Sequence, residues 1–251
     1  MLLRRRKMGN TTNSGGIDYS KQYFTMEALE DTIITIYIYS YIVKPVDIVS
    51  YSLDEGKTWT TYNNVTSYIN TPVLTAGSKI LWKILPNIEY NNDSYLFTFG
   101  SQGKVNVFGN LMSLFYFDDF ENKNLTLGNQ CNSLFCDCKI VEAKNLVLPN
   151  NTTDGCYYEM FAYNIHLISA PVLIADTLNY SCYEGMFREC YSIERIELFA
   201  TQYVVYTWMD VSYIFNGWLD NVAPIGVLKR KREFTAVDPY IPSGWTIEYL
   251  D

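Results

Sequence analysis

A 26-residue block that begins at Cys156 is followed directly by a degenerate copy of itself, which begins at Cys182. A third, earlier copy is marked by Leu134 and Phe135. Because one unit of a stacked repeat cannot bury its apolar side chains alone, the recurring positions are expected to pack against adjacent copies. We therefore regard these residues as core and as poor candidates for catalysis. The recurring pairs are Cys156 and Cys182, Tyr157 and Tyr183, Met160 and Met186, and Phe161 and Phe187.

The cysteines are interpreted in the same register. Several of them recur with the repeat, and no signal peptide is recognised at the N-terminus, so small buried side chains are favoured over disulfides. Cys136 and Cys138 have the spacing closest to that of a metal site, but the chain holds one histidine and no second close cysteine pair. We therefore predict no metal and no cofactor. The six cysteines are Cys131, Cys136, Cys138, Cys156, Cys182 and Cys190.

Charge divides the chain into a basic N-terminal arm and an acidic body. The net charge is −8, but the first ten residues hold Arg4, Arg5, Arg6 and Lys7 and no acid, so the remainder carries −12. An acidic body argues against nucleic-acid binding, which depends on neutralised phosphates. The arm either docks on an acidic protein surface or frays as a solvated terminus. We mark its four basic residues as candidate anchoring residues.

Two further class predictions come from composition. No apolar run approaches the length of a membrane span, so no membrane association is expected. The chain contains 22 Tyr, 13 Phe and 5 Trp, and aromatic side chains supply large core and interface areas. This surplus predicts a homo-oligomer, with dimer and trimer left open.

Residues 23–108 have the pattern of a β-sandwich. Ile34, Ile36 and Ile38 alternate with Thr and Tyr residues, which is the signature of a strand with one buried face. Short strands separated by turn residues at close intervals are typical of a sandwich. The further strands are predicted at 49–53, 58–62, 79–84, 95–99 and 105–108.

The segment from Ser52 to Trp59 matches the Asp-box pattern Ser-x-Asp-x-Gly-x-x-Trp. Such a hairpin device lets Asp54 accept hydrogen bonds from backbone N–H groups, Gly56 adopt a positive φ, and Trp59 pack under the loop. Asp-boxes also recur on the blades of sialidase-like enzymes. Since this chain has one copy, far from any plausible catalytic set, we favour the turn-stabilising interpretation.

Several polar groups are considered as sites and set aside. Asp118, Asp119 and Glu121 lack the ligand spacing of a calcium loop, which favours a polar connector. The single histidine, His166, is interpreted as an exposed loop residue without a nucleophile or partner. The basic run 229–232 is interpreted as a solvated edge, the alternative being contact with an acidic partner.

Each repeat is expected to contain a short helix, because its apolar residues fall at i, i+1, i+4 and i+5. Short β-type runs at 146–148 and 196–198 complete the unit. We divide the chain into a flexible basic arm (1–22), a β-sandwich domain (23–108), a connector (109–133), degenerate repeats (134–201) and a C-terminal cap (202–251).

Residues 130–201 carry Cys-Tyr-x-x-Met-Phe, then Leu-x-x-Ala-Pro and Leu-x-Ala-x-Thr-Leu. This pattern resembles the BspA-type leucine-rich repeat of gut Bacteroidales and their phages, including crAss-like phages. The hairpin at 51–59 and the segment Ile-Pro-Ser-Gly-Trp-Thr at 241–246 also occur in many similar proteins, whereas Asn164 replaces the usual Cys and Ile174 stands where Pro is common. The resemblance implies a mixed β and α/β fold: an N-terminal β-sandwich, then a short, degenerate leucine-rich-repeat solenoid with a C-terminal cap.

The same resemblance implies binding or assembly and no enzymatic activity. The leading prediction is a bacteriophage virion structural protein, a head or tail fibre subunit assembled in the host cytoplasm. It would attach to capsid or tail proteins through its N-terminal region and contact the host surface. The alternative is a cell-surface or receptor-binding adhesin module that recognises a glycan or a protein.

Overall fold

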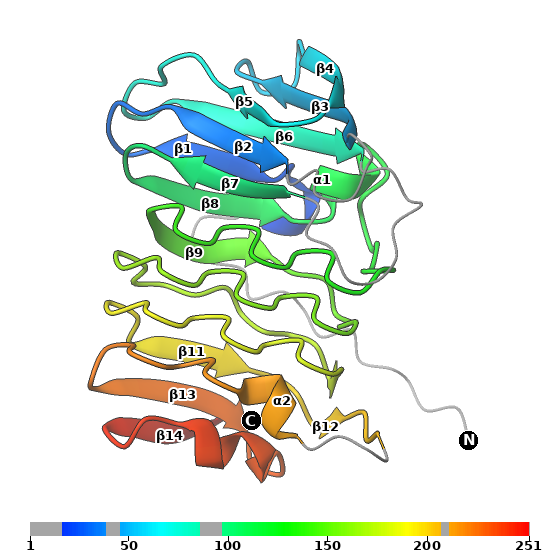
Figure 1. Cartoon of the computed structure of the whole chain (residues 1–251). Helices are drawn as coiled ribbons and strands as arrows, with labels where there is room; N and C mark the ends of the chain where they lie inside the picture. Colours follow the sequence, from blue (N-terminus) through cyan, green and yellow to red (C-terminus); the bar gives the residue numbers. More distant parts are fainter. Residues whose placement is uncertain (1–16, 39–45, 86–96, 207–210, 251) are drawn as a thin grey trace.

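The computed structural model describes residues 17–38, 46–85, 97–206 and 211–250, and strands predominate in this part of the chain. Figure 1 shows two facing sheets at one end, with layers of chain stacked below them as far as the C-terminus. The helices in the described residues are short. They are η1 (Tyr19–Lys21) and η2 (Thr235–Tyr240), both 3-10 helices, and α1 (Ser113–Tyr116) and α2 (Ser212–Phe215).

The facing sheets are consistent with the predicted β-sandwich. The larger sheet has the strand order β4-β3-β6-β1-β8-β9 and the smaller has the order β5-β2-β7. Phe99 of the smaller sheet packs on Trp82 of the larger, with ring centroids 5.2 Å apart. The larger sheet contains β1 (Thr25–Ala28), β3 (Val46–Ser52), β4 (Thr60–Val65), β6 (Lys79–Leu85), β8 (Val105–Asn110) and β9 (Ile140–Val147). The smaller contains β2 (Ile34–Ile38), β5 (Tyr68–Asn70) and β7 (Phe97–Ser101).

The strand pattern of the sequence explains this region well. In β2, Ile34, Ile36 and Ile38 are buried while Tyr37 is 44% exposed, because successive side chains of a strand point to opposite faces. Each of the other five strands predicted between residues 49 and 108 overlaps an observed one. The short strand β5 was not predicted.

Below the sandwich the chain forms coils that stack through backbone hydrogen bonds. Tyr157 N donates to Cys182 O at 3.1 Å, and Phe161 N donates to Met186 O at 3.0 Å. The N–H groups of alternate residues make these bonds, each to a carbonyl 25 residues later, from Asn129 to Asp137 and again from Gly155 to Tyr163. The 26-residue register of the sequence is therefore a register of backbone pairing between coils.

The helix predicted in each repeat is wrong. Within a coil, N–H groups bond three residues back, as Met160 N does to Tyr157 O at 3.1 Å. Every fourth residue then has a positive φ, including Gly155 (61°), Glu159 (49°) and Tyr163 (65°). A right-handed helix cannot continue through left-handed residues, so the segment is a series of tight turns.

The predicted fold class is wrong for the same reason. The described residues are mostly β-sheet, in several small sheets, and contain no α/β leucine-rich-repeat solenoid. The expectation failed because apolar residues at i, i+1, i+4 and i+5 fit a four-residue turn period as well as a helix.

A fourth layer lies where no repeat was predicted. Gly185 N donates to Asn216 O at 2.9 Å, Phe187 N to Trp218 O at 3.0 Å, and Glu189 N to Asp220 O at 2.8 Å. These partners are 31 residues apart, so this interval is six residues longer than the 25 of the earlier layers. The fourth layer could not be recognised from the sequence because its longer interval breaks the 26-residue period.

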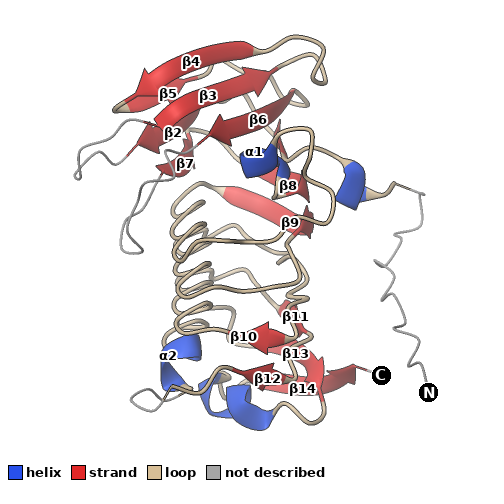
Figure 2. Ribbon diagram, turned by 90° about the vertical axis from the view of Figure 1, so that its right-hand side faces the viewer, coloured by secondary structure: helices blue, strands red, loops and turns tan. Residues whose placement is uncertain are grey.

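The opposite side of the stack is built from extended chain (Figure 2). It begins with β9, which pairs parallel with β8 and so joins the coils to the sandwich. It ends in a parallel sheet of order β11-β13-β14. The remaining strands are β10 (Thr177–Leu178), β11 (Arg195–Leu198), β12 (Gln202–Tyr203), β13 (Gly226–Lys231) and β14 (Trp245–Leu250).

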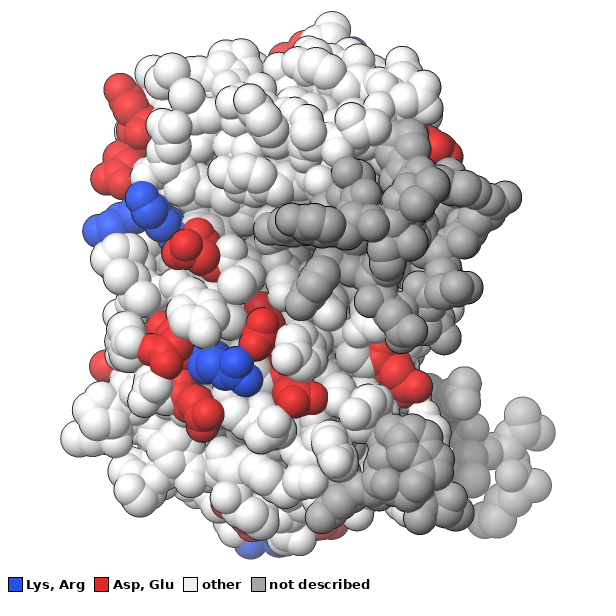
Figure 3. All heavy atoms as spheres, in the orientation of Figure 1, with Lys and Arg blue, Asp and Glu red and all other residues white. Residues whose placement is uncertain are grey.

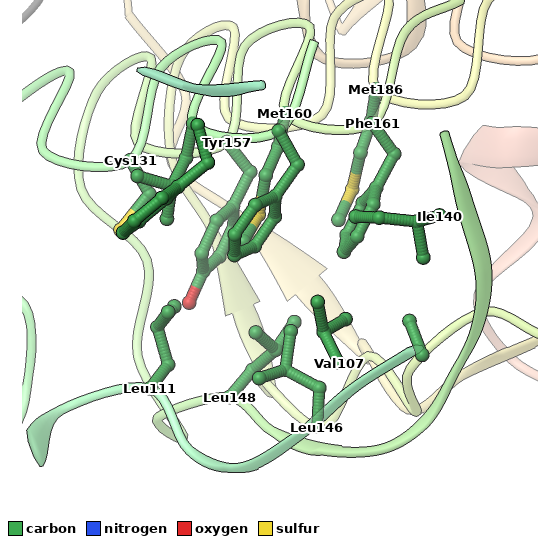
Figure 4. Packing of buried hydrophobic residues seen from close by; sticks show 14 of the residues in the cluster. Val107, Leu111, Cys131, Ile140, Leu146, Leu148, Tyr157, Met160, Phe161 and Met186 are labelled. Atoms are coloured by element: carbon green, nitrogen blue, oxygen red, sulfur yellow. The ribbon is translucent and has the colours of Figure 1, made fainter. Parts of the chain in front are cut away.

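One buried cluster runs through sandwich and stack. Its axis is a ladder of rings: centroid distances are 5.8 Å for Phe99–Phe135, 5.4 Å for Phe135–Phe161 and 5.8 Å for Phe161–Phe187. Figure 4 shows side chains of the turn side, such as Met160, directed toward Val107 and Leu146 of the strand side. Since burying one such side chain stabilises by about 1.5–3 kcal/mol, the ladder is a main source of stability.

Candidate functional site

The predicted anchoring residues Arg4, Arg5, Arg6 and Lys7 lie outside the described residues. The first described residue of the same terminus, Ile17, lines a cavity of about 240 Å³. This cavity lies beside η1, on the outer face of β1, β6, β8 and β9. It is the described cavity nearest in sequence to the basic arm.

The cavity combines aromatic, amide and charged side chains. The rings of Tyr19 and Phe108 meet edge to face with centroids 5.9 Å apart, and Lys79 Nζ lies 5.6 Å from the Phe108 centroid. On the other side Asn106 Oδ1 accepts a hydrogen bond from Glu142 N at 3.1 Å. A ring beside amides and carboxylates suits a ligand that has both an apolar face and many hydroxyl groups, such as a sugar residue.

A second cluster surrounds Lys83 of β6. Its Nζ lies 2.6 Å from Asp118 Oδ1 and 4.1 Å and 5.0 Å from the ring centroids of Trp59 and Tyr23. The Lys83 side chain is only 10% exposed, whereas that of Asp118 is 75% exposed. The ammonium group therefore ties the Asp-box hairpin and the connector to the sheet through one carboxylate and several ring faces.

The ionisation of this cluster follows from its contacts. Hydrogen bonds from Lys83 and then Tyr23 lower the pKa of Asp118. Burial, and next the hydrogen bond to Asp118, raises the pKa of Tyr23 to about 12. The lowered pKa keeps Asp118 ionised and the raised pKa keeps Tyr23 neutral near neutral pH, so the Lys83–Asp118 contact is a structural ion pair.

The Asp-box hairpin has the predicted geometry. Asp54 Oδ1 accepts hydrogen bonds from Thr58 N at 2.9 Å and Ser52 Oγ at 2.8 Å. Gly56 has a φ of 87°, and Trp59 Nε1 donates to Gly56 O at 3.1 Å. The turn-stabilising interpretation of this motif is confirmed.

The cysteine side chains contribute to packing. All six cysteines are free, and five of them are buried, Cys136 being the half-buried one. Burial raises the pKa of the Cys156 and Cys190 thiols to about 12, and raises that of Cys136 to about 11. Thiols with such pKa values carry little thiolate at neutral pH and are weak nucleophiles.

Asn164 and Cys190 play related parts in successive coils. Asn164 is fully buried; its Nδ2 donates to Phe135 O at 2.7 Å and to Phe161 O at 2.9 Å. Its Oδ1 accepts from Ile140 N at 2.8 Å. Cys190 Sγ donates to the same Phe161 O at 3.1 Å. The Asn164 side chain therefore adds hydrogen bonds between layers.

Two interpretations of polar residues need correction. His166 is half-buried, although it was expected to be exposed. The basic run 229–232 is not a solvated edge, because β13 is the central strand of its sheet and Arg230 is 2% exposed. Arg230 Nη2 lies 2.7 Å from Asp238 Oδ2. Nothing in the sequence distinguished the buried arginine from its neighbours.

Two of the acidic connector residues form ion pairs with different lysines. Asp118 pairs with Lys83, and Asp119 pairs with Lys123 at 2.8 Å. Among the described residues, no group of three or more His, Cys, Asp and Glu side chains is placed to hold a metal ion.

Comparison with known proteins adds no family assignment. No protein-family model matches the chain, and no match was found among curated proteins or solved structures. In the ranges that the structure describes, no helix is long and apolar enough to cross a membrane.

Proposed function

We propose that this chain is a non-enzymatic bacteriophage virion structural protein, a head or tail fibre subunit held by its N-terminal region. The observation that carries the proposal is the continuous backbone ladder and core that join the sandwich to the C-terminal sheet. A continuous stack of this kind is suited to act as a rigid spacer, because each layer is held in place by the layers on both sides of it.

The distribution of reactive groups supports the same role. The recurring Cys and Tyr residues are buried, and desolvation raises the pKa of the Cys182 thiol and the Tyr183 hydroxyl well above their ordinary values. These side chains stabilise the stack and are withdrawn from solvent. The recurring side chains of the repeat therefore contribute to the rigidity of the stack.

Charge supports attachment through the arm. Acidic side chains outnumber basic ones on the face of the body in Figure 3, and the whole chain carries −8. Although the body is acidic, the basic N-terminal segment would still be attracted to an acidic site on a capsid or tail protein.

Purified particles provide the test. Immunogold labelling against this chain is expected to decorate virions, and a variant with Arg4, Arg5, Arg6 and Lys7 changed to Glu is expected to be missing from them. Lys57→Glu, in the exposed hairpin, is the matched control and should be incorporated normally. Absence of the epitope from wild-type particles would refute the virion role.

The second candidate is a receptor-binding module that recognises a glycan, and the cavity beside η1 favours it. Phe108 and Asn106 supply the ring face and amide that a sugar requires. Phe108→Ala is expected to abolish binding of the purified chain to extracted host surface polysaccharide, whereas Tyr68→Ala, at a residue 59% exposed on the smaller sheet, should bind normally. Equal binding by both variants would exclude this cavity as the glycan site.

A further inference from the structure

The last layer of the turn side has main-chain donors for which the described residues supply no acceptor. Figure 2 shows α2, which belongs to this fourth layer (residues 211–221), below the stacked turns. In each earlier layer, alternate N–H groups point outward and bond carbonyl groups of the next layer. In the fourth layer the corresponding N–H groups, here called the open row, are those of Gly217, Leu219 and Asn221.

The backbone of the fourth layer places the open row in the outward position. Trp218 N donates to Phe215 O at 3.2 Å, three residues back, and Asp220 N bonds within the layer in the same way. The open row alternates with these internal bonds, as the outward donors of the earlier layers do. Gly217 and Asn221 also have positive φ values of 62° and 55°, like the residues at the same places of those layers. The open row is therefore directed toward the place that a fifth layer would occupy.

The open row borders a cavity of about 470 Å³. Its walls include Phe215 and Trp218 of the fourth layer, and Pro239, Tyr240 and Pro242 of the segment that follows β13. Trp218 Nε1 donates to Tyr240 O at 3.1 Å, which holds the two walls together. A row of main-chain donors beside apolar walls suits a peptide, whose backbone supplies acceptors while its side chains fill the cavity.

The earlier layers show what such a row binds. Phe161 N donates to Met186 O at 3.0 Å. Phe187 N donates to Trp218 O, also at 3.0 Å. In each case the acceptors are main-chain carbonyl groups of alternate residues in a chain with the same succession of turns. The complement of the open row is therefore another segment of polypeptide in this conformation.

Asp220 defines the charge of that segment. It is the charged side chain among the residues that line the cavity, it is exposed, and it forms no ion pair within the described part of the chain. Between earlier layers a carboxylate does have such a partner, since Arg188 Nη1 lies 2.7 Å from Glu159 Oε1. The Asp220 carboxylate disfavours an anion in the cavity and favours a peptide that carries Arg or Lys.

We propose that this end of the stack binds a peptide segment of another protein, which adds a fifth layer. The peptide accepts hydrogen bonds from the open row and directs a basic side chain toward Asp220. The site lies at the end of the stack remote from the sandwich (Figure 1), so it is separate from the cavity beside η1. The proposal goes beyond the virion role and does not depend on it, because the peptide can come from a virion protein or from a host protein.

An NMR titration of the full chain with a synthetic peptide tests the site. The peptide has the sequence of residues 181–190, which cover the second layer in the structure, with Cys182 and Cys190 changed to Ala. Tyr163 N bonds Arg188 O at 2.8 Å between those layers. In the same register the Arg188 carbonyl of the peptide faces the last donor of the open row, beside Asp220.

The expected result is selective. The amide signals of the open row should shift and their hydrogen exchange should slow, whereas those of Trp218 and Asp220 should change less because their N–H groups are already bonded within the layer. Ser243→Trp places a ring in the cavity and is expected to abolish binding. An open row that does not respond to the peptide would overturn the proposal.

A charge exchange tests the role of Asp220. Asp220→Lys is expected to weaken binding of the peptide about tenfold, and a peptide with Arg188→Glu should restore it. Glu194→Lys changes an exposed acid that does not line the cavity, and it should bind the original peptide normally. Circular dichroism must give each variant the wild-type melting curve, because Asp220, Ser243 and Glu194 are all exposed.

Three further outcomes would overturn the proposal. Binding that survives both Asp220→Lys and Ser243→Trp would place the peptide elsewhere. Inorganic phosphate that shifts the open row as the peptide does would make this an anion site. Self-association of the wild-type chain that Ser243→Trp abolishes, measured by light scattering, would show that a second copy covers the open row.

Discussion

Asn164 offers the sharpest test of how the layers are held together. Asn164→Ala removes the two short hydrogen bonds that Nδ2 donates to Phe135 O and Phe161 O, and the one that Oδ1 accepts from Ile140 N. The carbonyls of Phe135 and Phe161 keep backbone donors, namely Cys138 N at 3.2 Å and Asn164 N at 3.3 Å. Ile140, which is fully buried, loses the side-chain acceptor of its N–H group.

The expected cost follows from this difference. A buried N–H that loses its side-chain acceptor costs about 1–3 kcal/mol, and each of the other two lost bonds costs about 0.5–1.5 kcal/mol. We therefore expect Asn164→Ala to lower the free energy of unfolding by about 3 kcal/mol. Asn164→Cys should cost less, because a thiol can donate to Phe161 O as Cys190 does in the next coil.

Urea denaturation followed by circular dichroism and tryptophan fluorescence measures both changes. The exposed neighbour Ile165, 46% exposed, provides a control, and Ile165→Ala should change the free energy by no more than about 0.5 kcal/mol. If Asn164→Ala cost less than about 1 kcal/mol, the idea that side-chain bonds lock β9 to the coils would be refuted.

Four other measurements probe the remaining clusters. The hydrogen bond from the Thr58 backbone, with those from side chains, lowers the pKa of Asp54 from 3.8 to about 2. The stabilisation that the ionised Asp54 gives the fold is therefore complete above pH 3.8 and is lost as the pH falls through about 2. Asp54→Asn should flatten that part of an acid-unfolding curve. Lys83→Met should raise the pKa of Asp118 in an NMR titration, and an unchanged pKa would contradict the ion pair. Iodoacetamide should modify Cys136 before any other cysteine of the folded chain, as mass spectrometry of peptides would report. Tyr157→Phe should stabilise the fold by about 1 kcal/mol in thermal unfolding, because the buried Tyr157 hydroxyl has no hydrogen bond in the described structure; destabilisation would count against this reasoning.

Local patterns predicted the sandwich well because they report directly on the local backbone. The alternation over 34–38 identified β2, and the Asp-box residues identified a turn whose hydrogen bonds all lie within eight residues. The 26-residue period likewise identified which side chains are buried, since Met160, Phe161, Met186 and Phe187 are all fully buried.

The coil backbone could not be predicted in the same way. Glu159, Tyr163 and Glu189 have positive φ, yet none is a glycine or an asparagine that would signal it. Their conformation is imposed by hydrogen bonds to the next coil, which a period count does not specify. The sequence consequently fitted a helix and a turn series equally well.

The candidate cavity had no sequence signal at all. Tyr19, Lys79, Phe108 and Glu142 come from four separate elements, and only the strand order brings them together. The open row of the fourth layer was hidden for a similar reason, because whether a layer is internal or terminal depends on partners distant in sequence. Charge also misled at Arg230, whose burial depends on Asp238.

The ladder between coils makes the length of this protein adjustable in whole steps. Cys131 N bonds Cys156 O, and Tyr157 N bonds Cys182 O, in the same geometry. Excision of residues 156–181 would bring Cys182 to the position of Cys156 and rejoin equivalent partners. Since neighbouring extended chains lie about 4.8 Å apart, each gain or loss of a coil would change the reach of the molecule by that increment. Duplication or deletion of one repeat in the gene would therefore change the distance between the sandwich and the C-terminal sheet in fixed steps, without a change in either of them.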